Sequence, residues 1–153
     1  MNFNELATKQ NVLNALILKD GNNELGKELK VKIMRLRIAY KKARKQVDED
    51  INEFTQDLLS EDAKAIQQKP EKERTSEEVA ILEAAVNKAN IEYKEFLTQK
   101  GLEEIPFSAN DSFTDEEFDE LTDVNVGNTV TINEHEIKTE ELLEAFYTLF
   151  VTE

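Results

Sequence analysis

The longest helical pattern in the chain covers residues 25–58. Apolar side chains recur there every three or four residues, the spacing that places them on one side of an α-helix. They are Leu25, Leu29, Ile33, Leu36, Tyr40, Ala43, Val47, Ile51, Phe54 and Leu58. At 1.5 Å per residue such a helix is about 50 Å long, whereas a compact domain of this length has a diameter of about 38 Å. We therefore expect the helix to bend, break or extend beyond its own domain.

A second long helix is predicted over residues 75–101. Thr75 and Glu78 form the spacing of a capping box at its start, and Gly101 is a typical end residue. Its apolar positions are Val79, Leu82, Val86, Ala89, Tyr93 and Phe96. A shorter helix is expected over 60–68. We expect the two long helices to lie antiparallel and to bury their apolar sides against each other.

Shorter elements are predicted at both ends of the chain. A first helix is expected over residues 3–19, followed by a turn at 20–23. Near the C-terminus, Thr114 begins a helix that runs through Leu121. Residues 129–138 have the pattern of a small β-hairpin, and Thr139 is expected to cap a last helix.

Together these patterns predict a mainly α fold, built from a long antiparallel helical hairpin, shorter helices and a small C-terminal β-hairpin. A chain of 153 residues has the length of one domain, so residues 1–153 are expected to form a single helical domain. Within it, residues 1–100 form the helical hairpin region. Residues 101–153 form an acidic region with the β-hairpin and the terminal helix.

The charge is distributed unevenly along the chain, whose formal net charge is -14. Residues 27–46 carry nine Lys and Arg side chains against Glu28, a net charge of +8, whereas residues 101–153 carry Lys138 against fifteen acidic side chains. Either the two regions neutralise each other, within the fold or between copies, or Lys27–Lys45 contacts nucleic acid or an acidic partner. Because the overall acidity opposes approach to phosphate, nucleic acid is not expected as the main ligand.

The basic segment also carries a second apolar stripe, made by Val31, Met34 and Ile38. Either neighbouring elements of the same chain cover this stripe, or it contacts another subunit, since Met and Arg are favoured at interfaces. We predict a partner interface on this segment. Its residues are Lys30, Val31, Met34, Arg35, Arg37, Ile38, Lys41, Arg44 and Lys45.

Residue types typical of catalysis and metal binding are sparse. The chain has no cysteine and a single histidine, His135, which rules out a usual zinc site and is expected on the surface of the hairpin. Asp123–Glu134 partly follows the spacing of a calcium-binding loop, but Gly127 and Asn128 stand in the wrong order, so a polar turn is favoured. No glycine-rich phosphate-binding motif is present. We therefore expect no enzymatic activity, cofactor or metal.

The sequence also lacks the features of a secreted or membrane protein. Its first residues do not form a signal peptide, and no segment approaches the roughly 20 consecutive apolar residues of a membrane span. We expect no membrane contact and a location in the cytoplasm, or in a particle assembled there.

Residues 26–40, continuing into 48–54, resemble small acidic helical proteins of tailed bacteriophages, particularly the crAss-like phages of Bacteroidales. The hairpin at 129–138 followed by Leu142 and Leu143 is similar too. The resemblance implies a virion or assembly protein, for example in the head–tail connector, where helical subunits form rings. It implies that other virion proteins and copies of the chain itself are the partners, and it assigns no residue roles.

The sequence thus favours a non-enzymatic phage structural or assembly protein, located in the virion and assembled in the bacterial cytoplasm. It would act through the basic helix, which in an assembly of repeated subunits would contact the acidic last third of another copy. The alternative is an acidic phage-encoded inhibitor, which would present Asp and Glu side chains to a host enzyme where nucleic acid phosphates bind. The net charge of -14 motivates this alternative.

Overall fold

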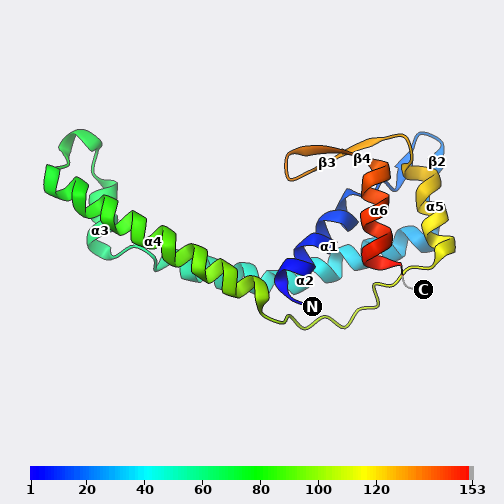
Figure 1. The fold of residues 1–153 in the computed structure, drawn as a ribbon, viewed down its shortest axis with the longest axis horizontal. Helices are drawn as coiled ribbons and strands as arrows, with labels where there is room; N and C mark the ends of the chain where they lie inside the picture. The colour runs from blue at the N-terminus through cyan, green and yellow to red at the C-terminus, as the bar shows by residue number, and fades with distance from the viewer. Residues whose placement is uncertain (152–153) are drawn as a thin grey trace. The chain divides into compact units, whose positions relative to one another are not determined.

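A computed structural model describes residues 1–151, which contain six α-helices, one short 3-10 helix and two antiparallel strand pairs (Figure 1). The mainly α fold with a small C-terminal β-hairpin is confirmed. None of the described helices combines the length and apolar character needed to cross a bilayer. The elements are α1 (Phe3–Ala15), β1 (Lys19–Asp20), β2 (Asn23–Glu24), α2 (Lys27–Gln56), α3 (Glu61–Gln68), η1 (Glu71–Glu73), α4 (Ser76–Leu102), α5 (Asp115–Asn125), β3 (Thr129–Ile132), β4 (His135–Lys138) and α6 (Thr139–Phe150).

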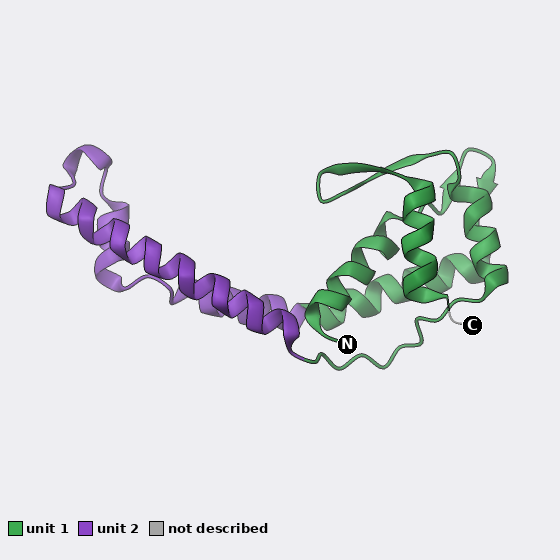
Figure 2. Cartoon of the chain, viewed as in Figure 1, with its two compact units in different colours: residues 1–44, 104–153 green, residues 45–103 purple. Residues whose placement is uncertain are grey.

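The chain divides into two compact units (Figure 2). Unit 1 combines Met1–Arg44 with the segment that starts at Glu104, and unit 2 is Lys45–Glu103. The sequence prediction grouped residues 1–100, whereas the structure packs residues 1–44 with the C-terminal segment. The reason is that the first half of α2 buries its apolar side in a core shared with α1, α5 and α6. A single domain stays a prediction.

The core of unit 1 is built around α2 and a group of aromatic rings. Phe113, Phe146 and Phe150 are almost fully buried, with ring centroids 4.9 Å apart for Phe113–Phe146 and for Phe146–Phe150. Tyr40 of α2 meets Phe150 edge to face at 6.4 Å. Helix α6 packs against both α1 and α5 (Figure 1). Because full burial of a large apolar side chain contributes about 1.5–3 kcal/mol, this cluster is the main stabilising feature of the unit.

Helix α1 is shorter than predicted. The expected helix over 3–19 ends at Ala15, because its last carbonyls are bonded from elsewhere in the chain. Arg37 of α2 donates to the carbonyl oxygens of Leu13 at 3.1 Å and Leu16 at 3.0 Å. The chain then turns into the β1–β2 hairpin instead of continuing the helix.

Unit 2 contains the predicted antiparallel hairpin. Residues 45–56 of α2 lie against the C-terminal half of α4, where Phe54 and Phe96 stack with centroids 4.0 Å apart and Asp50 pairs with Lys100 at 2.8 Å. The predicted helix over 60–68 is confirmed as α3, with Ser60 as its N-cap, and it packs on α4. The predicted capping box of α4 is also confirmed.

The C-terminal β-hairpin has the predicted boundaries, with Thr129 opposite Lys138. Two neighbouring elements differ from prediction. Helix α5 continues to Asn125 rather than ending at Leu121. Thr139 is not the N-cap of α6 but its first residue, and its side chain is buried. The Thr139 hydroxyl accepts from the backbone N–H of Asn128 at 3.1 Å and donates to the carbonyl of Asn128 at 3.0 Å.

Candidate functional site

Helix α2 exposes a mixed apolar and basic surface on the side opposite the core of unit 1. Helical geometry places seven residues there, which we call the basic face: Lys27, Val31, Met34, Arg35, Ile38, Lys41 and Lys42. Met34 is 50% exposed and Ile38 is 54% exposed. These two side chains, one helical turn apart, form the exposed apolar centre of the basic face.

The four cations of the basic face are exposed, and none of them forms an ion pair or hydrogen bond with residues 1–151. Two other lysines of α2 differ from them. Lys30 pairs with Glu24, and Lys32 bonds to Glu117 at 2.9 Å and to the carbonyl of Ser112 at 2.7 Å. Lys30 and Lys32 are therefore neutralised within unit 1, whereas the four cations of the basic face have no ion-pair partner among residues 1–151.

Two residues of the predicted partner interface have their donors used inside unit 1. Arg37 is half-buried and caps α1, and removal of its guanidinium from water lowers its pKa. Arg44 donates to Gln10 at 3.1 Å. The two arginines lie seven residues apart and hence on the same side of the helix, a signal that the sequence contained.

The other predicted interface residues lie on or near the basic face. Val31, Met34, Arg35, Ile38 and Lys41 belong to it. Lys30 borders it, and Lys45 is exposed in unit 2 and lies 4.0 Å from Glu49. The sequence prediction omitted Lys27 and Lys42, although the helical period places them beside Val31 and Ile38.

A groove of about 630 Å³ lies between α5 and α6. Its lining is mainly apolar with two carboxylates, and we call it the acidic groove: Phe118, Thr122, Val126, Glu140, Leu143, Glu144, Tyr147 and Thr148. Val126 is 49% exposed and Tyr147 is 40% exposed. The rings of Phe118 and Tyr147 meet edge to face, with centroids 5.0 Å apart, and form an aromatic wall of the groove.

Further carboxylates border the acidic groove. The Tyr147 hydroxyl donates to Asp115 at 3.3 Å, and Asp119 follows Asp115 by one helical turn on the exposed side of α5. Within the lining, Glu140 accepts a hydrogen bond from the backbone N–H of Gly127 at 3.2 Å. The groove therefore combines an apolar floor with a negatively charged rim, the reverse of the charge on the basic face.

Comparisons with known proteins give no relative. No protein-family model, no curated protein and no solved structure matches this chain. The resemblance to small phage proteins stays a prediction.

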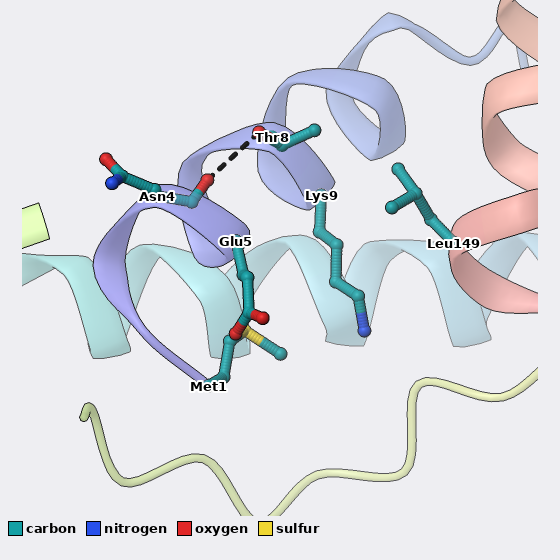
Figure 3. A pocket seen from close by; sticks show the side chains of 6 residues that line it. All are labelled: Met1, Asn4, Glu5, Thr8, Lys9 and Leu149. Carbon is teal, nitrogen blue, oxygen red and sulfur yellow. Dashed lines mark hydrogen bonds between the residues drawn. The ribbon is translucent and has the colours of Figure 1, made fainter. Parts of the chain in front are cut away.

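A second cavity, of about 430 Å³, lies between the chain start, α1 and α6 (Figure 3). Figure 3 shows Leu149 of α6 across from Lys9, and the hydrogen bond that the Thr8 hydroxyl donates to the carbonyl of Asn4 at 2.9 Å. Glu5 closes the capping box of α1, and Lys9 pairs with Asp111 at 3.0 Å. Glu5, Thr8 and Lys9 of the lining thus each have a hydrogen-bond or ion-pair partner within unit 1.

The most perturbed ionisable group of unit 1 is Tyr40. Burial, together with the hydrogen bond that its hydroxyl donates to Asp111 at 2.5 Å, raises the pKa of Tyr40 far above its usual range. Asp111 also accepts from Lys9. This buried group fastens the segment before α5 to α1 and α2, which is a structural role.

Residues 1–151 contain no cluster of three or more His, Cys, Asp or Glu side chains that could hold a metal ion. The calcium-loop spacing of Asp123–Glu134 does not form a loop, since Asp123 lies within α5 and Glu134 lies in the turn between β3 and β4. His135 is exposed on β4, as expected for a hairpin histidine.

Proposed function

We propose that this chain is a non-enzymatic structural or assembly protein of a phage particle that acts through protein–protein contacts. The observation that carries the proposal is the basic face of α2. Met34 and Ile38 are half exposed there, between cations that have no ion-pair partner among residues 1–151. An apolar centre within a polar rim is the usual composition of a protein interface.

The expected partner surface is apolar with a rim of carboxylates. Because about half of Met34 and of Ile38 is already covered, burying the remainder contributes roughly 1 kcal/mol for each side chain. The cations add orientation and a faster encounter more than affinity. A single contact of this strength is weak, so the surface suits an assembly in which many copies bind together.

The particle setting comes from the resemblance of residues 26–54 and 129–143 to small acidic phage proteins. Of the structure, only the mainly helical fold agrees with what that resemblance implies. A component of the head–tail connector ring is the proposed position in the particle.

The test is an affinity pull-down from phage-producing cells, treated with nuclease and analysed by mass spectrometry. We expect capsid, portal or tail proteins in a fixed ratio to the chain. The double variant Met34→Ser, Ile38→Ser is expected to lose them. The matched control Ile81→Ser, Ile91→Ser removes two exposed apolar side chains of α4 and is expected to retain them. Loss of the virion proteins by the control variant, together with their retention by the Met34→Ser, Ile38→Ser variant, would refute the proposed surface.

One observation favours the alternative of an acidic inhibitor. Asp115, Asp119 and Asp123 are exposed and follow one another by four residues along α5, a rise of about 6 Å for each step. Such a row can stand in for phosphates. Recovery of a single host nuclease or polymerase in the pull-down, together with absence of the chain from purified particles, would replace the structural proposal by this one.

A further inference from the structure

We infer that the acidic groove between α5 and α6 binds the basic face of α2 from a second copy of the chain. The inference rests on the proposed function, because it names one partner of the basic face. Both surfaces belong to unit 1, and their apolar side chains Met34, Ile38, Val126 and Tyr147 are exposed among the residues that the structure describes there.

The apolar parts of the two surfaces match a helix lying in a groove. Met34 and Ile38 are one helical turn apart, and they are the two most exposed large apolar side chains of unit 1. The groove offers an apolar floor from Phe118 and Leu143, with the exposed side chains of Val126 and Tyr147 along its walls. Anchors at positions i and i+4 are the usual way in which a helix binds such a groove.

The charges of the two surfaces are opposite. The basic face carries four cations, Lys27, Arg35, Lys41 and Lys42. The groove and its edge carry carboxylates at Glu140, Glu144, Asp115 and Asp119. Two copies with a net charge of -14 repel each other at long range. At contact, inside the screening length of about 8 Å, the charges that face each other decide the interaction.

The same charges exclude the symmetrical pairings. Two basic faces would bring eight cations together, and two grooves would bring their carboxylates together, both of which are unfavourable. The favourable pairing is therefore face to groove. It joins different surfaces of the two copies, so every added copy presents a further face and a further groove, and assembly continues until a ring closes or a filament forms.

The test uses two variants of the full chain with reversed charges, studied by sedimentation velocity over the micromolar concentration range at one fixed ionic strength. The face variant carries Arg35→Glu, Lys41→Glu and Lys42→Glu. The groove variant carries Asp119→Lys and Glu144→Lys. We expect the wild-type chain to form concentration-dependent oligomers, and each variant alone to remain monomeric. An equimolar mixture of the variants is expected to form dimers and nothing larger, because it contains one intact face and one intact groove.

Matched controls reverse exposed charges in unit 2. Lys72→Glu, Lys88→Glu and Lys94→Glu reproduce the charge change of the face variant, and Glu83→Lys with Glu95→Lys that of the groove variant. Both controls are expected to assemble as the wild type does. Circular dichroism checks that each variant is folded. For a variant that fails this check, the corresponding Gln or Asn substitutions replace the charge reversals, and a weaker but measurable loss of oligomers is expected.

Three results would overturn the inference: a monomeric wild-type chain throughout the micromolar range, a charge-reversed variant that still assembles alone, or a mixture without dimers. Failure of the proposed function has a different signature. Recovery of virion proteins without self-association refutes only the face-to-groove contact. Self-association without recovery of virion proteins refutes only the particle setting.

Discussion

Replacing Asn125 by alanine tests how the backbone of Ile17 is attached to the core of unit 1. Asn125 is fully buried, and its side chain makes three hydrogen bonds. Its Oδ1 accepts from the backbone N–H of Ile17 at 2.8 Å, and its Nδ2 donates to the carbonyl of Ile17 at 3.0 Å and to that of Leu121 at 2.8 Å. The side-chain amide thus forms hydrogen bonds with both the N–H and the C=O of Ile17, as the backbone of a neighbouring β-strand would.

The alanine variant leaves the N–H and the C=O of Ile17 without these partners, whereas the carbonyl of Leu121 keeps its helical hydrogen bond. An unsatisfied buried polar group costs about 1–3 kcal/mol, so the two groups of Ile17 together should lower the free energy of unfolding of Asn125→Ala by about 2–6 kcal/mol. For a domain whose total stability is about 5–15 kcal/mol, this is a large fraction.

The free energy of unfolding is measured by urea titration followed by circular dichroism. The midpoint is expected to fall while the slope with urea stays unchanged. Asn90→Ala, at an exposed position of α4, is the control and is expected to change stability by less than about 0.5 kcal/mol. A loss below about 1 kcal/mol for Asn125→Ala would refute the reasoning, because it would mean that water replaces the amide without cost.

Three further substitutions are expected to change the free energy of unfolding, each for a different physical reason. Arg37→Met keeps the packing of the side chain but removes the hydrogen-bond donors to the end of α1. The free energy of unfolding should therefore fall by about 1–3 kcal/mol, and amide hydrogen exchange should rise first at that end of the helix. Unchanged exchange there would contradict the capping role. Glu134 has a φ of 68°, so Glu134→Gly should raise stability by about 0.5–1 kcal/mol in a thermal melt, and a lower melting temperature would contradict the strain. Burial tends to raise the pKa of Glu117, but the hydrogen bond and charge of Lys32, with the capping bonds of Thr114, hold it below the usual value. Since the folded pKa is depressed, its stabilising contribution is present above the unfolded pKa of about 4.3 and is lost as the pH falls through the folded pKa. Urea midpoints of Glu117→Gln should therefore fall less steeply in acid than those of the wild type, and parallel profiles would count against this.

The elements that the sequence predicted best are those whose signals are local. In α4, Thr75 and Glu78 form both hydrogen bonds of the capping box, each at 3.1 Å, so two residues only three positions apart decide where the helix starts. The β3–β4 hairpin is similar, because alternation and a two-residue turn at Asn133 and Glu134 determine its register.

The features that the sequence did not predict depend on partners far along the chain. The end of α1 is set by Arg37, more than twenty residues later, and Ile17 is held by Asn125, more than one hundred residues later. Periodicity identified the buried side of α2, but not that its first half packs in unit 1 and its second half in unit 2.

The candidate site was predicted in part. The stripe of Val31, Met34 and Ile38 followed from helical spacing alone, whereas the capping role of Arg37 requires knowledge of where α1 ends. The acidic groove was not predicted, because its two walls come from α5 and α6, which a β-hairpin separates in sequence. A groove between two helices depends on their packing, which hydrophobic periodicity does not describe.

The division of the chain also sets an order of events during synthesis. Unit 2 is continuous, so it can form as soon as residue 103 has left the ribosome. Unit 1 is interrupted, so the apolar sides of α1 and α2 remain uncovered until the segment from Glu104 onward has been made. About a hundred residues follow Arg44, and at about 5–20 residues per second their synthesis takes roughly 5–20 s. During that interval Leu6, Leu13 and Ile33 are open to chaperones, and a chain that stops early, with unit 2 complete, is exposed to proteases at its N-terminal end.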